Sequence, residues 1–320
     1  MAVSADGEPV LSVVVPLFNE EGNVAPLLDR LNAILSALPG QPSYEVILVN
    51  DGSADGTAQR IRTQMQQRRH IVLVSLSRNF GHQLAATAGL DIARGQAVIL
   101  MDGDLQDPPE LIEQFLERWR AGYDVVYAIR RTRKGESRFK LLTASVFYRL
   151  IKRMTNVSIP VDTGDFRLMS RRVVDALRQS RERHRFLRGM VSWTGFNQTG
   201  VEYDRDERFS GQTKYPLRKM LKFAIDGITS FSDVPLRFAS YLGFTVSTAA
   251  FIYAIVIILF KAFRWGTPEY ARGWASTMVV ILFLGGVQLI GIGILGEYLG
   301  RIYDEVKARP LYLIGDIERS

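Results

Sequence analysis

The N-terminal part of the chain alternates between short continuous apolar runs and longer stretches with helical periodicity. Runs of valine, isoleucine and leucine bounded by turn residues are typical of strands that are buried on both faces. Apolar residues that return every three or four positions are typical of amphipathic helices. The pattern predicts strands over residues 11–17, 44–50, 71–77, 97–101 and 124–129, and helices over residues 24–38, 57–68, 82–93 and 108–120. This alternation indicates an α/β fold with a mostly parallel sheet, in which ligands bind beyond the carboxyl ends of the strands.

The chain changes character near Pro235, where two long apolar blocks begin. They cover residues 238–260 and 276–297, and each has roughly the 20 apolar residues that a membrane-spanning helix requires. The alternative is a buried helix pair in a soluble protein, which the lack of charge through most of both blocks disfavours. Basic residues flank the blocks on their outer sides, which predicts that both chain ends are cytoplasmic. The expected domains are therefore a cytoplasmic domain over 1–235, two transmembrane helices within 236–300 and a cytoplasmic extension over 301–320.

Two further segments, residues 138–154 and 216–228, combine an apolar helical face with basic residues on its flank. This pattern is typical of a helix that lies in the headgroup region of a membrane. An ordinary helix on the surface of a domain gives the same pattern, so both interpretations stay open.

Composition narrows the classes of partner without choosing one. A net charge of +7 suits a nucleic acid, a membrane surface or a phosphorylated substrate. We expect no nucleic acid partner, because the basic residues concentrate near the predicted membrane helices. The chain has no cysteine, which excludes disulfides, thiolate metal sites and a cysteine nucleophile. The N-terminus lacks the basic start and apolar core of a signal peptide, so the first domain is expected in the cytoplasm.

Polar side chains follow four of the predicted strands at the point where each strand ends. Asn19 and Glu20 follow the first strand, Asp51 the second, and Arg78 and His82 the third, while the acidic stretch MDGDLQDPPE follows the fourth. Each group alone is explained as a helix cap or a turn. Four groups at one edge of a parallel sheet favour a ligand site instead. The chain has neither a G-x-G-x-x-G motif after the first strand nor a P-loop, so phosphates must be bound in another way.

The stretch MDGDLQDPPE, residues 101–110, contains candidate metal ligands. Asp102 and Asp104 flank a glycine, and oxygen ligands at alternate positions suit Mg²⁺ or Mn²⁺, which complete their shells with water and substrate phosphates. An EF-hand is excluded, because its sixth position counted from Asp102 is Asp107 rather than glycine. Asp107 precedes two prolines and lies three residues before Glu110, which predicts a helix N-cap followed by a capping box.

The motifs NDGSADGT, SRNFGHQLA, MDGDLQDPPE, VDTGDFRLMSRR and GEYLGRIYDEVKARPLY resemble those of the family 2 polyprenyl-phosphate glycosyltransferases with the GT-A fold. The resemblance is greatest to the bacterial bactoprenol glucosyltransferases (GtrB-type), and dolichyl-phosphate mannosyltransferases and the undecaprenyl-phosphate aminoarabinose transferase are relatives. It extends over nearly the whole chain. It implies a Rossmann-like, mostly parallel sheet in the catalytic domain, followed by interfacial helices and two transmembrane helices.

The resemblance implies an enzyme of the bacterial inner (plasma) membrane that moves a sugar from a nucleotide sugar to undecaprenyl phosphate with the help of Mg²⁺ or Mn²⁺. UDP-glucose is the expected donor, and GDP-mannose or a UDP-aminoarabinose is the alternative. The family also implies a homo-oligomer such as a tetramer, in which the C-terminal extension is available to pack on a neighbouring subunit.

The resemblance implies roles for individual residues as well. The nucleotide-sugar site would contain Pro16, Glu20, Asp51, Asp102, Gly103 and Gln106. The metal ligands would be Asp102, Asp104 and Gln106, and the catalytic residues would be Asp104 and Asp165. The acceptor phosphate or the donor diphosphate would contact Arg130, Arg138, Arg208 and Lys214, with Arg131 and Arg133 as alternatives to Arg138.

The chemistry of the acceptor limits what Asp165 has to do. A phosphate monoester has a second pKa of about 6 and is already mostly ionised at neutral pH, so it scarcely needs a general base. We therefore expect Asp165 to orient the acceptor or to stabilise positive charge that develops on the sugar. A single in-line displacement would invert the anomeric carbon.

Two rival functions explain part of the pattern. A processive polysaccharide synthase shares the sugar-nucleotide domain, but it requires a Q-x-x-R-W motif after the sheet, and the similar residues 114–119 have one residue too many. A membrane-anchored regulator that binds nucleotides explains the strand-end groups, but not Asp165 together with the basic loop around Lys214.

Overall fold

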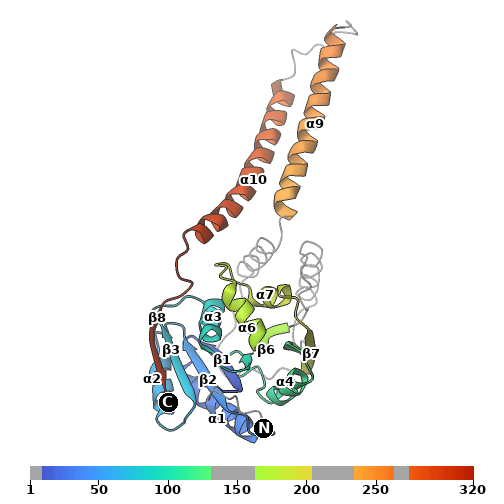
Figure 1. The fold of residues 1–320 in the computed structure, drawn as a ribbon. Coiled ribbons are helices and arrows are strands. Elements are labelled where there is room, and N and C mark those ends of the chain that lie inside the picture. Colours follow the sequence, from blue (N-terminus) through green and yellow to red (C-terminus); the bar gives the residue numbers. More distant parts are fainter. Residues whose placement is uncertain (1–8, 131–162, 204–233, 263–273) are drawn as a thin grey trace. The chain divides into compact units, whose positions relative to one another are not determined.

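The computed structural model describes residues 9–130, 163–203, 234–262 and 274–320 (Figure 1). These residues belong to two compact units, an α/β unit that includes the C-terminal residues and a helical unit. The segments expected as interfacial helices, residues 138–154 and 216–228, lie outside the described ranges.

The α/β unit is built on one eight-stranded sheet with the strand order β7-β5-β6-β4-β1-β2-β3-β8. The strands are β1 (Leu11–Leu17), β2 (Tyr44–Asn50), β3 (Ile71–Leu76), β4 (Ala97–Leu100), β5 (Val125–Arg130), β6 (Thr163–Ser170), β7 (Gln198–Tyr203) and β8 (Ile314–Arg319). β1 is parallel to β2 and β4, β2 to β3, and β5 to β7. β6 is antiparallel to β4 and β5, and β8 is antiparallel to β3. The predicted α/β class with a mostly parallel, GT-A-like sheet is confirmed.

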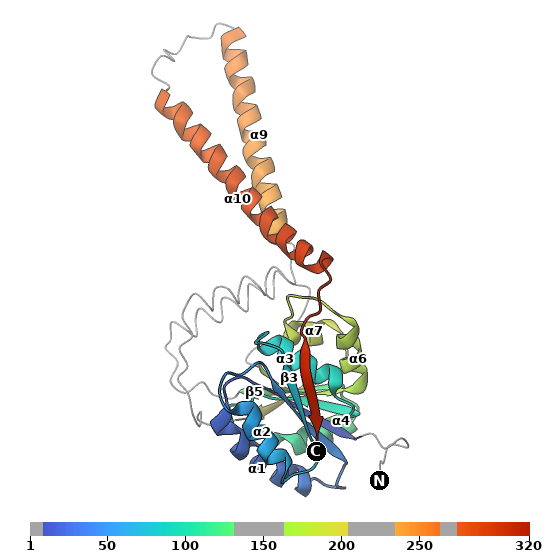
Figure 2. The same cartoon turned by 90° about the vertical axis from the view of Figure 1, so that its left-hand side faces the viewer.

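Helices cover both faces of the sheet (Figures 1 and 2). The main core lies between one face and the helices α1 (Glu21–Ala37), α2 (Thr57–Met65) and α4 (Leu111–Arg120). The other face carries α3 (His82–Ile92), which contacts β1 and β2, and α6 (Arg171–Gln179), which contacts α3 and α7 (Leu187–Trp193). A Cβ atom at Gly89 of α3 would lie 2.2 Å from Val14 Cγ1, so glycine lets this helix approach β1 closely. Strand residues that face either way are therefore buried, which is why β1 is apolar at every position except Ser12.

The C-terminal residues form the edge strand β8 of the same chain's sheet. Arg62 Nε donates to Glu318 Oε1 at 2.8 Å, and Ser320 N donates to Ile71 O at 3.0 Å. Part of the extension that was expected to be available to a neighbouring subunit is thus paired with β3. The sequence pattern did not predict this strand, because its side chains are mostly exposed and carry several charges.

The helical unit contains α9 (Val234–Ala262) and α10 (Trp274–Val306), which contact each other. Both predicted apolar blocks, residues 238–260 and 276–297, are therefore helical. Within the part of the chain that the structure describes, one helical segment, Val279–Val306, is long and apolar enough to cross a membrane, and an 18-residue stretch of it has a mean hydropathy of 2.4.

The prediction for the start of α4 was wrong. The helix begins at Leu111, three residues later than predicted, and Asp107 is not its N-cap. Asp107 is instead buried and accepts a hydrogen bond from the Tyr203 hydroxyl at 3.1 Å. Glu110 does not form the predicted capping box but pairs with Arg30 at 2.8 Å. The strand β7 supplies a buried partner for Asp107, and local spacing in the sequence cannot reveal such a distant partner.

Candidate active site

The loops that follow β1 and β2 are tied together by side-chain hydrogen bonds. Asn19, which has a φ of 55°, accepts a hydrogen bond on Oδ1 from Ala54 N at 2.9 Å. Its own N–H donates to Ser53 Oγ at 3.0 Å. Glu20 N donates to Thr57 Oγ1 at 2.9 Å. These bonds hold the predicted nucleotide residue Glu20 beside the loop that begins with Asp51.

Asp51 connects the ends of β2 and β3. It is buried, and its carboxylate accepts hydrogen bonds from Phe80 N at 2.7 Å, Gly81 N at 2.9 Å and Asn79 Nδ2 at 3.1 Å. Burial raises the pKa of Asp51, and the hydrogen bonds from the backbone offset only part of that rise. These contacts show that Asp51 holds the loop after β3 in place, while its contact with a nucleotide stays a prediction.

The loop after β4 is a tight turn against the end of β1. Leu105 has a φ of 62°, and Asp104 Oδ1 accepts a hydrogen bond from Gln106 N at 3.2 Å. A Cβ atom at Gly103 would lie 2.3 Å from Leu17 Cδ2, so a side chain there would force the buried Leu17 side chain to shift. The glycine between the two aspartates therefore lets the loop pack closely against Leu17, whether or not it also contacts a ligand.

The strand β6 brings Asp165 to the aspartate loop. The antiparallel register pairs Leu100 with Arg167, and continuing it by two residues puts Asp102 opposite Asp165. His82, the first residue of α3, lies between them, with Nε2 at 3.4 Å from Asp102 Oδ1 and 3.3 Å from Asp165 Oδ2. Burial acts to lower the pKa of His82, but the hydrogen bond to Asp165 and the charge of Asp102 outweigh it and raise the pKa to about 9. The imidazole is therefore a cation at neutral pH in this geometry.

The carboxylate of Asp165 is buried and bound at both oxygens. Arg188 Nε from α7 donates to Oδ1 at 2.7 Å, and Gln83 Nε2 from α3 donates to Oδ2 at 3.1 Å. Arg188 also donates to Thr163 O at 2.9 Å, and Gln83 Oε1 accepts from Leu187 N at 2.9 Å. Burial acts to raise the pKa of Asp165, but the charges of the arginine and the imidazole hold it well below its usual value. Asp165 is thus a fixed anion in a cluster that contains two cations.

Three of these side chains can hold a metal ion. His82, Asp102 and Asp165 each offer one ligand atom, and these atoms lie within 4.8 Å of one another. Asp102 Oδ1 is buried and has no hydrogen-bond partner among the described residues. A buried carboxylate oxygen normally has such a partner, so its position fits a cation beside it, either the His82 imidazolium at 3.4 Å or a bound metal ion. Asp104 is not part of this three-residue group, and the metal set Asp102, Asp104 and Gln106 stays a prediction.

The remaining predicted site residues are placed as follows. Pro16 is buried within β1, where it pairs with Val49 of β2. Arg130 is the last residue of β5. The other three basic residues predicted for the phosphates lie outside the described residues, and they are Arg138, Arg208 and Lys214.

Sequence reasoning missed Gln83 and Arg188. Gln83 directly follows His82 at the start of a helix, after a strand-end motif. This position in the sequence was enough to mark it as a candidate site residue. Arg188 had no such signal, because α7 is short and reaches Asp165 only through the antiparallel placement of β6.

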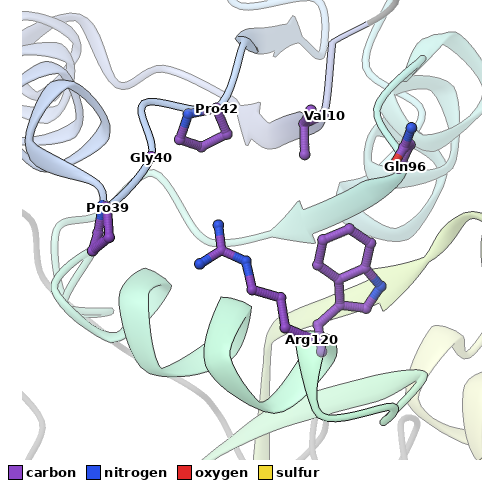
Figure 3. Close-up of a pocket in the computed structure, with 7 residues that line it drawn as sticks. Val10, Pro39, Gly40, Pro42, Gln96 and Arg120 are labelled. Carbon is purple, nitrogen blue, oxygen red and sulfur yellow. The ribbon is translucent and has the colours of Figure 1, made fainter. Parts of the chain in front are cut away.

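A separate cavity of about 800 Å³ lies at the other end of the sheet (Figure 3). It is lined by Val10, Pro39, Gly40, Pro42, Gln96, Trp119 and Arg120. Val10 and Gln96 immediately precede β1 and β4, so the cavity lies at the amino ends of these strands. It is therefore not part of the cluster around Asp102 and Asp165.

Comparisons with known proteins place these features in context. The sequence matches the model of the family "Glycosyl transferase family 2" over residues 12–178 and that of the "GtrB C-terminal hairpin" over residues 234–302. It is 52% identical over 307 residues to "Uncharacterized glycosyltransferase sll0501" of Synechocystis, an alignment that covers 96% of this chain and 95% of the relative. It is 44% identical over 310 residues to "SfII prophage-derived bactoprenol glucosyl transferase" of Shigella flexneri, covering 97% of this chain and 99% of the relative.

Proposed function

Because this chain belongs to glycosyl transferase family 2, it is a glycosyltransferase, and we propose that it transfers glucose from UDP-glucose to a polyprenyl phosphate. The prediction of an enzyme is confirmed by the family match. The observation that carries the proposed acceptor is the similarity, over nearly the full length of both chains, to a bactoprenol glucosyl transferase. GDP-mannose and a UDP-aminoarabinose remain the alternative donors.

The cluster at the strand ends suits this reaction. The leaving group is a nucleoside diphosphate, and a divalent cation, Mg²⁺ or Mn²⁺, held at Asp102 would supply Lewis-acid stabilisation of its charge. Asp165 is held as an anion by Arg188, so it can orient the acceptor or stabilise positive charge on the sugar. The acceptor phosphate is itself ionised at neutral pH and attacks without a general base. A single displacement then inverts the anomeric carbon.

Basic residues are proposed to bind the two phosphate groups. Arginine suits this role because its planar guanidinium group binds phosphate oxygens in a bidentate manner. The proposed residues are Arg130, Arg138, Arg208 and Lys214.

A lipid acceptor requires the active site to work at a membrane. We propose that α9 and α10 both cross the bacterial inner membrane, with both chain ends in the cytoplasm. Their lengths of 29 and 33 residues exceed the roughly 20 residues that a crossing helix needs. The segments 138–154 and 216–228 are proposed to lie at the membrane surface, and the enzyme is proposed to be a homotetramer.

An assay with the purified full chain tests the function. The protein in detergent is incubated with radiolabelled UDP-glucose, undecaprenyl phosphate and Mg²⁺ or Mn²⁺, and labelled lipid is extracted into organic solvent. We expect labelled lipid that depends on the cation and is lost with chelator. Parallel reactions contain GDP-mannose or a UDP-aminoarabinose. Absence of labelled lipid with all three donors would overturn the proposal. Labelled lipid from GDP-mannose alone, or from the UDP-aminoarabinose alone, would identify that compound as the donor in place of UDP-glucose.

A further inference from the structure

The imidazole of His82 lies between the carboxylates of Asp102 and Asp165. Its Nε2 lies 3.4 Å from Asp102 Oδ1 and 3.3 Å from Asp165 Oδ2. Arg188 donates to Oδ1 of Asp165, and the oxygen that faces the imidazole, Oδ2, also accepts a hydrogen bond from Gln83 Nε2 at 3.1 Å. The imidazole side chain is 43% exposed, so it is accessible from solvent.

These separations match those of ligands around one ion. Two ligand atoms at about 2.1 Å from an octahedral ion and at right angles to each other lie about 3.0 Å apart. The two distances from Nε2 exceed this value by only a few tenths of an ångström. The three ligand atoms also lie within 4.8 Å of one another.

A second observation points to an ion at the same place. Asp102 Oδ1, the atom that faces His82, is buried without a hydrogen-bond partner among the described residues. A buried carboxylate oxygen without a hydrogen bond is unfavourable unless a cation lies beside it, and the cation is either the His82 imidazolium at 3.4 Å or a bound metal ion.

We propose that His82 is a direct ligand of the divalent cation, together with Asp102 and Asp165, and that it makes the site prefer Mn²⁺ to Mg²⁺. The inference deepens the proposed function, from which the need for a cation is taken. Imidazole nitrogen is a common ligand of transition metals, whereas Mg²⁺ favours oxygen ligands and keeps much of its water. A site made only of carboxylates and an amide oxygen would lack this preference.

A different role for His82 makes the opposite prediction. An imidazolium that stays protonated would itself neutralise the two carboxylates and would repel an incoming ion. Removing it would then strengthen the binding of cations. Weaker cation binding in the variant therefore indicates that His82 is a metal ligand. Tighter binding indicates that the imidazolium takes the place of the ion.

The test measures ion binding by the purified full chain without substrates. MnCl₂ is titrated into the protein, and free Mn²⁺ is followed by electron paramagnetic resonance, with MgCl₂ as competitor. The variant is His82→Gln, and the matched control is His70→Asn, which changes an exposed histidine whose φ is 69° to a residue that tolerates this conformation. Pulsed spectra of bound Mn²⁺ report directly whether an imidazole nitrogen is coordinated.

We expect wild type and His70→Asn to show nitrogen coupling to Mn²⁺. His82→Gln should lose the coupling and weaken Mn²⁺ binding by at least about tenfold, which is the lower end of what losing even an outer-shell partner costs. Its Mg²⁺ affinity should change much less. Unchanged or tighter Mn²⁺ binding in His82→Gln, or no nitrogen coupling in the wild type, would overturn the inference. Nitrogen-coordinated Mn²⁺ in a protein that fails to glycosylate undecaprenyl phosphate would leave the inference intact and overturn only the proposed function.

Discussion

Arg188 Nε lies 2.7 Å from Asp165 Oδ1, and this ion pair connects α7 to the start of β6, where the candidate catalytic carboxylate lies. The pair explains why a buried carboxylate stays charged. It also limits the chemistry, because a carboxylate whose pKa is held well below its usual value is a weak base.

The first prediction concerns the role of Asp165 in the reaction. Asp165→Asn should slow glycosyl transfer by about 100-fold, the scale expected when one stabilising charge is lost from a transition state. The slowing should be the same at every pH between about 6 and 8, because the wild-type carboxylate is already ionised throughout that range. The measurement is the rate of lipid labelling against pH for both proteins. A wild-type rate that rises with pH through one titration, and a variant that lacks this titration, would restore a general-base role.

The second prediction concerns the ion pair itself. Arg188→Gln should lower the free energy of unfolding by about 2 kcal/mol, less than for a fully buried pair because the arginine is 25% exposed. Arg188→Lys should recover part of this loss, because lysine keeps the positive charge but lacks the planar guanidinium group with its fixed donors. The control is Arg30→Gln, which breaks the exposed pair with Glu110 and should cost at most about 0.5 kcal/mol. Denaturant unfolding of the three variants gives the comparison, and equal losses for Arg188→Gln and Arg30→Gln would contradict it.

The sequence predicted the central strands well and the antiparallel ones not at all. β1 and β2 match their predicted bounds because each is mostly apolar, lies between turn residues and is buried on both faces. β6 was missed because Asp165 and Arg167 interrupt its apolar pattern although both are buried. Arg167 is accommodated by hydrogen bonds to backbone oxygens of its own strand. The local pattern of apolar and polar residues does not predict these bonds.

The same limit applies to the site. Asp102 and His82 stand out as polar residues at strand ends, whereas Asp165 could be singled out only because VDTGDFRLMSRR resembles a family motif. That the three meet depends on the register of β6 against β4, which is a long-range pairing. Arg188 could not be predicted, since its only link to the site is through that pairing.

The third prediction follows from the raised pKa of His82. An imidazole that titrates at about 9 when folded and at 6.5 when unfolded stabilises the protein fully below pH 6.5 and loses that contribution as the pH rises towards 9. Because the side chain is 43% exposed, we expect only about 1 kcal/mol. In the presence of chelator, the wild type should therefore lose about that much more stability than His82→Gln between pH 6.5 and 9. Parallel pH profiles of the melting temperatures would contradict the assignment.

The fourth prediction concerns the contact between the loops after β2 and β3. Gly52 has a φ of 64°, and a Cβ atom there would lie 2.3 Å from the backbone carbon of Arg78. Gly52→Ala should therefore destabilise the fold by about 3 kcal/mol, through both a left-handed conformation and overpacking. Gly40→Ala is the control, because Gly40 has a φ of 80° but no atom within 4 Å of the added carbon, so only about 1 kcal/mol is expected. Denaturant unfolding gives the free energy of unfolding of both variants. Similar losses for Gly52→Ala and Gly40→Ala would show that the two loops can move apart at no cost in stability.

The last prediction divides the acidic stretch after β4 into two parts. Asp104→Ala should abolish cation-dependent transfer while leaving the melting temperature within a few degrees of wild type, because the family resemblance implies that Asp104 is a metal ligand. Asp107→Ala should instead lower stability by about 1–3 kcal/mol, because Asp107 is buried and its loss leaves the Tyr203 hydroxyl without the acceptor at 3.1 Å. Transfer rates and unfolding free energies are measured for both variants at a temperature where both are folded. An Asp107→Ala protein that is stable but inactive would move this residue into the reaction, and an active Asp104→Ala protein would remove Asp104 from it.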